Sequence, residues 1–286
     1  MWLSGPYVVL LLVALVVPLA HLGAISIFTH HPRLMFVAEP TLENYARLLQ
    51  PYYLEVLVRT LRIGLVTTLC CMVLGVPLAY WLARCGPTAL GIGLFLLVMP
   101  MMVSTVVRAF GWMIILGRNG VINQISVGLG FERWLFVMNT ETAVVIALVQ
   151  ICLPLLVLPT LASIERIPRS LEEAAANLGA SPVQLFRRVI LPLAAPGIAS
   201  GAVLAFLVAI GVVVTPALMG GRGSRMIGNE IYDQLITALN WPFASAMAIA
   251  LIAIVLGAVI ASRAAAAAAE RFRREAARRR ASAGGA

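Results

Sequence analysis

Few residues of this sequence are of the types that do catalytic chemistry, and their spacing fits no catalytic motif. The 286-residue chain has three histidines and four cysteines, and its 21 basic residues are all arginine. Without a lysine, the chain can form neither a phosphate-binding Walker A loop nor a Schiff base. His21, His30 and His31 have no partner at metal-ligand spacing. We therefore expect no catalytic site and no metal site in this chain.

The composition indicates a membrane protein. Hydrophobic residues make up 61% of the chain and charged residues only 12%, whereas soluble domains carry roughly 25% charged residues. A spanning helix needs about 20 apolar residues, and six runs approach or exceed that length. The sequence therefore predicts an all-α, polytopic membrane protein with six transmembrane helices, at Tyr7–Phe28, Val56–Ala83, Ala89–Val107, Thr142–Ile164, Gly197–Leu218 and Ala244–Ser262.

The distribution of arginine predicts the orientation of these spans. Short connections on one side carry Arg84, Arg187 and Arg188, followed by seven arginines in the last 24 residues. Because basic residues concentrate on the cytoplasmic side, both termini are expected in the cytoplasm. We divide the chain into a membrane domain, residues 1–263, and an Arg- and Ala-rich tail, residues 264–286. Such a tail suits contact with anionic lipid headgroups, and with Phe272 as its one aromatic residue, we expect no nucleic-acid partner.

Charged residues inside the predicted spans are scarce. No Asp or Glu falls at a span centre, whereas ion-coupled carriers keep an intramembrane acid for proton or sodium binding. This argues against an ion-coupled secondary carrier. Arg59 and Arg62 lie one turn apart near the start of the second span, and because buried arginine is costly we expect both at the outer interface. There Arg59 either snorkels or lines the mouth of a translocation path.

Small and helix-breaking residues within the spans indicate how the helices pack. Gly197 and Gly201 are spaced for close contact between two helices. Prolines either kink packed helices or mark broken helices that line a pathway. They stand at positions 18, 77, 100, 154, 159 and 216.

The cytoplasmic segment between the fourth and fifth spans, residues 165–192, is unlike the rest of the chain. Ser170 and Glu173 are spaced as a capping box that opens a helix, and Gly179 is placed to end it in a left-handed cap. Ser181-Pro182-x-Gln184 predicts a second capping box and a second helix. We expect that helix to end near Leu191-Pro192. An isolated helix this short is marginal in water, so the first one needs a docking surface.

This segment resembles the EAA loop of the permease subunits of bacterial ABC importers of the type I, binding-protein-dependent kind. The resemblance rests on Glu173-Ala174-Ala175, on Gly179 after three intervening residues, and on the run Val189-Ile190-Leu191-Pro192. The family has isoleucine where Val189 stands. The resemblance implies a MetI-like fold in the bacterial inner membrane.

Further motifs resemble the spermidine/putrescine permease subgroup of that family, over nearly the whole chain. They are Leu42-Glu43-Asn44-Tyr45 with Leu48-Leu49, Pro100-(x)3-Ser104-(x)2-Val107-Arg108-(x)3-Trp112, Gly120-(x)2-Asn123, Gly220-Gly221-(x)5-Ile227-Gly228-Asn229 and Asn240-Trp241-Pro242-Phe243.

The resemblance implies the partners and the roles of the loop. A second, homologous permease subunit would share the path, two ATPase subunits would bind ATP and Mg, and a periplasmic binding protein would deliver the substrate. This chain itself would hold no cofactor. Glu173 would be the charged anchor toward the ATPase, Gly179 the hinge, and Ala174 and Ala175 the contact surface. The expected ATPase-coupling set also includes Leu171, Leu178 and Pro192.

The substrate is less determined by the sequence than the class of protein. Polyamines are cations, for which Trp112, Trp241, Tyr80 and Trp81 are candidate cation–π partners. Arg59, Arg62 and Arg108 favour instead an anionic or zwitterionic solute such as a phosphonate, an opine or an amino-acid-like molecule, and a non-transporting scaffold remains a further alternative. The expected substrate-pathway residues are Arg59, Ser104, Arg108, Trp112, Asn229 and Trp241.

Overall fold

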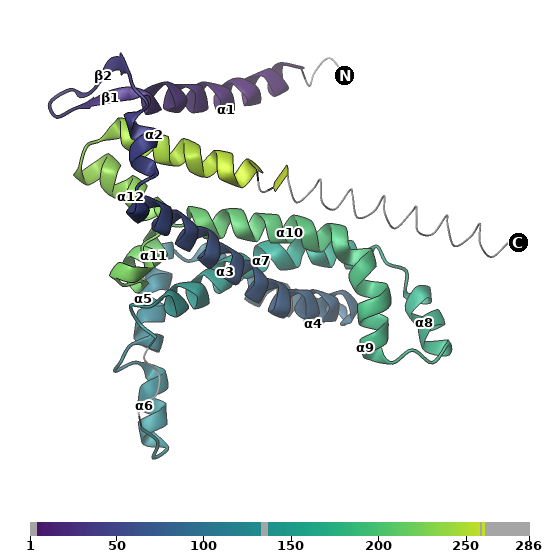
Figure 1. Ribbon diagram of the computed structural model, residues 1–286. Helices are drawn as coiled ribbons and strands as arrows, with labels where there is room; N and C mark the ends of the chain where they lie inside the picture. The colour runs from purple at the N-terminus through teal and green to yellow at the C-terminus, as the bar shows by residue number, and fades with distance from the viewer. Residues whose placement is uncertain (1–4, 133–136, 258, 261–286) are drawn as a thin grey trace, which may run out of the picture. The chain divides into compact units, whose positions relative to one another are not determined.

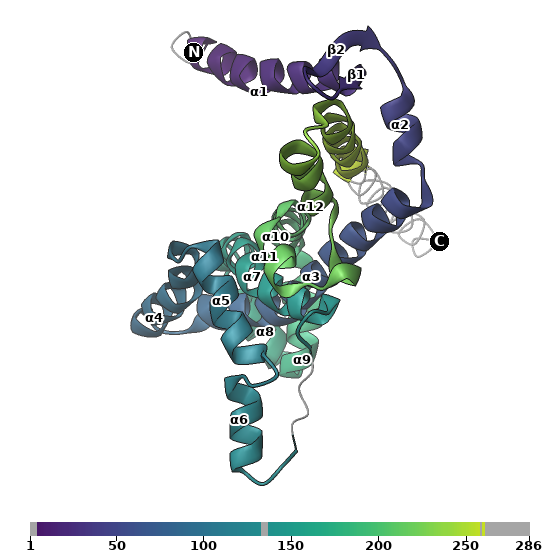
Figure 2. The same cartoon turned by 90° about the vertical axis from the view of Figure 1, so that its left-hand side faces the viewer.

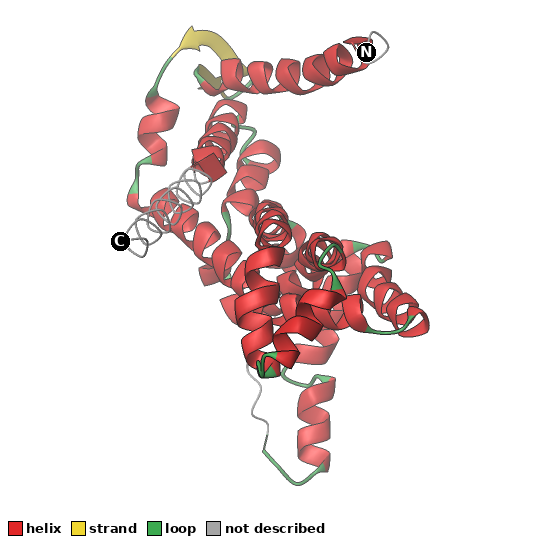
Figure 3. Ribbon diagram, turned by 90° about the vertical axis from the view of Figure 1, so that its right-hand side faces the viewer, coloured by secondary structure: helices red, strands yellow, loops and turns green. Residues whose placement is uncertain are grey.

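The computed structural model describes residues 5–132, 137–257 and 259–260. It divides into two compact units, residues 1–48 with 238–286 and residues 49–237. Helices make up most of both units (Figures 1 and 3), so the all-α class is confirmed. The predicted tail, residues 264–286, lies outside the described residues.

The smaller unit joins the two ends of the chain. The antiparallel hairpin of β1 and β2, with His31 opposite Met35, was not expected from the sequence. Asn44 holds this unit together, because its Nδ2 donates to the carbonyl oxygens of Ser26 and Phe28 at 2.9 Å each. The elements are α1 (Gly5–Ser26), β1 (Phe28–His31), β2 (Met35–Pro40), α2 (Glu43–Leu48) and a helix at Trp241–Gly257.

The larger unit consists of helices that follow one another along the chain (Figure 2). Its elements are α3 (Pro51–Arg84), α4 (Pro87–Val98), η2 (Met99–Met102), α5 (Thr105–Leu116), α6 (Val121–Gly128), α7 (Glu141–Glu165), α8 (Arg169–Asn177), α9 (Pro182–Leu185), η3 (Phe186–Ile190), α10 (Leu191–Gly211), α11 (Val214–Met219), η4 (Arg222–Ser224), α12 (Ile227–Tyr232) and η5 (Asp233–Thr237).

Helices α3, α7 and α10 form the core of the larger unit and bury apolar side chains from all three (Figure 1). The predicted contact at Gly197 and Gly201 is confirmed. A Cβ on Gly197 would lie 2.6 Å from the carbonyl oxygen of Pro159, and one on Gly201 would lie 2.7 Å from that of Leu156. The two glycines therefore let α10 approach the backbone of α7.

Three described helices are long and apolar enough to cross a membrane, and a bent helix pair would make a fourth. The three are Pro51–Arg84, Glu141–Glu165 and Pro182–Gly211. The bent pair, Pro87–Met102 with Thr105–Gly128, turns by 105°. The six-span count stays a prediction.

Two predicted spans have different bounds in the structure. The third, predicted as Ala89–Val107, is broken where Val103 is extended, after the 3-10 turn that contains Pro100. The fifth, predicted as Gly197–Leu218, belongs to a helix that ends at Gly211. That break follows from Pro216, whose ring clashes with the carbonyl four residues back, and that residue, Val212, is extended.

Most of the other prolines do not break their helices. Pro18, Pro77, Pro154 and Pro159 lie inside continuous helices. Neighbouring groups in a packed bundle can satisfy the backbone carbonyls that such prolines free. Of the six prolines expected within spans, Pro100 and Pro216 are the two that lie beside breaks between helical segments.

Candidate functional site

The cytoplasmic segment 165–192 forms two helices around a glycine cap, as expected. Gly179 has a φ of +81°, its N–H donates to the Ala176 carbonyl at 2.9 Å, and the Ala180 N–H donates to the Ala175 carbonyl at 3.1 Å. This pair of bonds is a Schellman motif, which needs a residue in the left-handed region. The second capping box is confirmed too, since Ser181 and Gln184 exchange side-chain to backbone bonds of 3.0 and 3.3 Å.

The first capping box, predicted at Ser170 and Glu173, is wrong. The helix α8 begins at Arg169, with Pro168 at the N-cap and no side-chain capping bond. Pro168 is extended, with φ −61° and ψ 135°, and its carbonyl accepts from the Leu171 N–H. With Pro168 at the N-cap, the helix starts two residues earlier than it would with Ser170 at the N-cap. Glu172, not Glu173, lies in the first turn.

The predicted end of the second helix near Leu191-Pro192 is also wrong. Helix α9 continues through the π-helical turn η3 into α10, so the helical run extends from Pro182 to Gly211. A proline removes one helix hydrogen bond and crowds the preceding turn, and the wider π turn before Pro192 accommodates both effects. Pro192 thus lies within a helix that links the loop directly to the membrane bundle.

The residues expected to couple to an ATPase lie mostly on the surface of α8. Glu173 and Ala174 are exposed and Ala175 is half-buried. Leu171 and Leu178 are 45% and 88% exposed, and no residue of α8 is buried. An apolar face this open on a short helix has no docking surface within the described chain. That an ATPase covers this apolar face stays a prediction.

Glu172 is the residue of this segment that the sequence reasoning missed. Its side chain is 14% exposed and forms an ion pair with Arg84, the last residue of α3. The Tyr80 hydroxyl donates to the same carboxylate at 3.0 Å, so α3 contributes two side chains to this contact. Two adjacent glutamates in the sequence gave no signal of which one faces inward.

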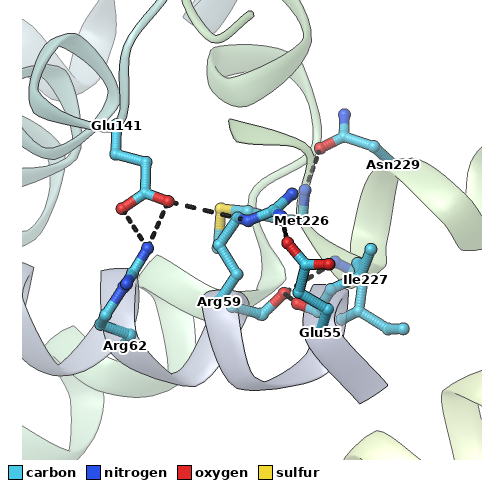
Figure 4. Close-up of polar contacts among 9 residues, drawn as sticks. Glu55, Arg59, Arg62, Glu141, Met226, Ile227 and Asn229 are labelled. Carbon is cyan, nitrogen blue, oxygen red and sulfur yellow. Dashed lines mark hydrogen bonds and ion pairs between the residues drawn. The ribbon is translucent and has the colours of Figure 1, made fainter. Parts of the chain in front are cut away.

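A second polar cluster lies at the opposite end of α3 and α7 (Figure 4). Arg59 pairs with Glu55 one turn away, and its Nε lies 3.7 Å from Glu141 Oε1 at the start of α7. Arg62 donates to Glu141 Oε2 at 2.7 Å. Arg59 is 13% exposed. The two arginines are therefore paired with carboxylates, and their position at the outer interface stays a prediction.

Helix α12 is attached to the same end of α3. The backbone N–H of Ile227 donates to Thr60 Oγ1 at 2.8 Å (Figure 4), and the Tyr52 hydroxyl donates to Glu230 at 2.8 Å. Asn229 uses both ends of its amide, accepting from the Met226 N–H at 3.2 Å and donating to the Val213 carbonyl at 2.8 Å. Its amide thus satisfies a carbonyl freed at the break after α10.

A half-open hollow of about 620 Å³ lies between α5, α11 and α12. Its walls are mostly apolar, with the rings of Phe110 and Tyr232 and the polar side chains of Asn229, Arg225 and Asp233. Arg225 pairs with Asp233 and, at 3.0 Å, with Glu230. Among the described residues that line the hollow, Asp233 is the one carboxylate, and it pairs with Arg225, so the hollow is aromatic-lined and nearly neutral in charge. The sequence did not predict a role for Phe110, Tyr232 or Asp233 in the path. The one available signal was that Phe110 follows Val106, which also lines the hollow, at helical spacing.

The other expected pathway residues do not gather at this hollow. Arg108 Nη2 donates to the Val103 carbonyl at 2.8 Å, and its buried Nε has no hydrogen-bond partner in the described part of the chain. Trp112 donates to Gln150 of α7 at 2.7 Å. Ser104 is exposed at the N-cap of α5, and Trp241 belongs to the smaller unit. Of the expected set, only Asn229 lines the hollow.

Comparison with known proteins identifies the class to which this arrangement belongs. Residues 72–274 match the family described as binding-protein-dependent transport system inner membrane component. The spermidine/putrescine transport system permease protein PotB of Escherichia coli (strain K12) is 42% identical over 221 residues, 77% of this chain and 80% of that protein.

Solved structures give the same fold. A bacterial ABC transporter involved in the import of the acidic polysaccharide alginate matches with a TM-score of 0.73 and 20% identity, over 91% of this chain and 93% of that one. The alginate ABC transporter in complex with an alginate pentasaccharide-bound periplasmic protein matches with a TM-score of 0.72 and 19% identity, over 89% of both chains.

The fold and these matches define a helical inner-membrane transport component and not an enzyme. The chain belongs to the family of binding-protein-dependent transport system inner membrane components, the permease subunits of ABC importers, and has the MetI-like fold expected from its EAA segment.

Proposed function

We propose that this chain is a permease subunit of an ATP-driven importer for polyamines, spermidine and putrescine. The observation that carries the substrate is the 42% identity with the spermidine/putrescine permease of Escherichia coli over 77% of this chain. A periplasmic binding protein would deliver the substrate, and a second, homologous permease would complete the path. Both termini would lie in the cytoplasm.

The charges at the end of the bundle opposite α8 support a cation over an anion. Arg59 and Arg62 favoured an anionic solute when considered alone, but Glu55 and Glu141 pair with them. An anionic solute would therefore have to displace carboxylates that already bind these arginines.

The hollow beside α12 supports the same choice of substrate. Phe110 and Tyr232 supply aromatic rings, and Asp233 supplies a carboxylate beside them that pairs with Arg225. Ammonium groups are attracted to aromatic faces and carboxylates. We propose this hollow as part of the polyamine path. Asn229 would position α12 beside the hollow. Other parts of the path, outside the hollow, would include Ser104, Arg108, Trp112 and Trp241.

ATP hydrolysis would take place on a pair of partner ATPase subunits, with their Mg. The exposed face of α8, with Glu173, Ala174, Leu171 and Leu178, would dock in a groove of one ATPase. Closure of the ATPases would then move α8 and switch the bundle between inward- and outward-facing states. Such a switch needs a ligand that binds the two states with different affinity, and ATP on the partner would be that ligand.

Uptake measurements in cells test this proposal. A strain that lacks this chain should lose uptake of labelled putrescine and spermidine and regain it with a restored copy. Loss and recovery of uptake of a phosphonate, an opine or an amino acid instead, with polyamine uptake unchanged in a strain without other polyamine systems, would refute the polyamine assignment.

A further inference from the structure

One arginine at the end of α3 links its own helix to two other parts of the larger unit, α8 and the end of α7. The Arg84 guanidinium is 17% exposed, and its Nε donates to Glu172 Oε1 of α8 at 2.7 Å. Its Nη2 pairs with the same carboxylate and donates to the Ile167 carbonyl at 3.2 Å, just after α7. Arg84 therefore joins α3, the end of α7 and α8 through one planar group with several donors.

Tyr80, one turn before Arg84, adds a second link from α3. Its hydroxyl donates to Glu172 Oε2 at 3.0 Å, so donors from α3 occupy both oxygens of this carboxylate. The Tyr80 ring meets the Phe186 ring edge-on, with the centroids 5.5 Å apart. Phe186 begins the π turn that leads into α10, so the same small cluster also contacts the second half of the coupling segment.

Apolar burial does not explain how α8 is held on the bundle. None of its residues is buried, and Leu178 just after it is 88% exposed. By contrast, Glu172 is 14% exposed and carries a charge with three donors around it. Removing one partner of a pair this well shielded from water leaves the other charge poorly compensated. The ion pair is therefore the main attachment of α8 to the membrane helices.

We infer that Arg84, assisted by Tyr80, is the positioning residue that transmits movement of α8 to α3 and α7 through Glu172. The inference rests on the proposed function and deepens it, because it assigns different tasks to adjacent glutamates. Glu173 is exposed, so a partner can contact it. Glu172 faces inward and ties the docked helix to the membrane domain. Because of this ion pair, α8 moves together with the bundle instead of sliding along it.

Two readouts on the complete importer, purified with its ATPase into lipid nanodiscs and vesicles, test this inference. The variants are Arg84→Gln, Glu172→Gln and the charge swap Arg84→Glu with Glu172→Arg. Arg118→Gln, which removes an exposed arginine between α5 and α6, is the matched control. The first readout is amide hydrogen exchange of the peptide covering residues 169–177. The second is the number of polyamine molecules imported per ATP hydrolysed.

Both single variants should exchange α8 amides at least tenfold faster than wild type and import at least tenfold fewer molecules per ATP. Their ATPase rate should stay within about twofold. The charge swap should restore a large part of both properties, and Arg118→Gln should change neither. If Arg84→Gln does not assemble, the charge swap decides through the second readout, because a pair needed only for assembly would leave the number of molecules imported per ATP unchanged in any variant that assembles.

Wild-type exchange and coupling in Arg84→Gln would overturn the inference, as would a charge swap that behaves like the single variants. Failure of the proposed function has a different signature. In that case wild-type vesicles import no polyamine, while the exchange of α8 still reports whether Arg84 holds this helix.

Discussion

The left-handed conformation of Gly179 offers a clean test of the coupling segment. Its φ is +81°, and a Cβ built on it would meet no atom within 4 Å. A side chain would therefore be penalised by the backbone conformation alone, and this costs roughly 1–2 kcal/mol for an L-residue. That energy lowers the equilibrium constant for the capped arrangement by a factor of about 5 to 30.

The prediction is an order of effects at this one position. Asparagine adopts the left-handed region more readily than other residues with side chains, and a β-branched residue does so least. We expect the number of spermidine molecules imported per ATP to fall in the order Gly179, Gly179→Asn, Gly179→Ala and Gly179→Val. The assay is uptake into vesicles that contain the complete importer, with ATP hydrolysis followed in the same samples.

Assembly has to be checked alongside this series. Because the cap lies on the surface, the four proteins should yield similar amounts of complex. Wild-type coupling in Gly179→Val would refute the role of the cap. Equal loss in Gly179→Asn and Gly179→Val would show that space for a side chain in the partner, and not backbone conformation, matters at Gly179.

Three further predictions concern packing, docking and the path. Gly201→Ala places a Cβ 2.7 Å from the Leu156 carbonyl oxygen, whereas the Cβ of Gly211→Ala in the same helix meets nothing within 4 Å. Because overpacking costs about 1–3 kcal/mol, only Gly201→Ala should lower the melting temperature in detergent, by about 2–12 °C. Equal melting temperatures of the two variants would contradict the close contact. Glu173→Lys should leave the permease folded but uncouple ATP hydrolysis from uptake, and normal transport by this variant would refute the anchor role. Phe110→Ala should lower kcat/KM for spermidine uptake by about 2- to 30-fold, which corresponds to the loss of a cation–π contact of about 0.5–2 kcal/mol. The affinity of the binding protein for spermidine should not change. An unchanged kcat/KM would exclude this ring from the path.

Features that depend on neighbouring residues were predictable from the sequence. The cap at Gly179 and the box of Ser181 and Gln184 follow from the local preferences of the backbone, and both are present. The close approach at Gly197 and Gly201 also follows from spacing on one helix face. The first capping box failed because Pro168 competes with Ser170 for the same end of the helix.

Features that depend on distant residues were not predictable in this way. Arg84 meets Glu172 across 88 positions, and Arg62 meets Glu141 across 79. Nothing in the local pattern distinguishes Glu172 from Glu173, since the choice depends on which one faces the end of α3. The same holds for the hollow, where Phe110 comes beside α12 only because the chain bends between α4 and α5.

Transport by the reconstituted complex tests directly whether this chain is part of an ATP-driven polyamine importer. Vesicles that contain this chain, the second permease and the ATPase should accumulate labelled spermidine only when the binding protein is outside and ATP is inside. Arg59 and Arg62 are already paired with carboxylates, so an anionic solute should not compete. Accumulation driven by a proton or sodium gradient without ATP would contradict an ATP-driven importer. Accumulation of an anionic solute in place of spermidine would contradict the polyamine assignment.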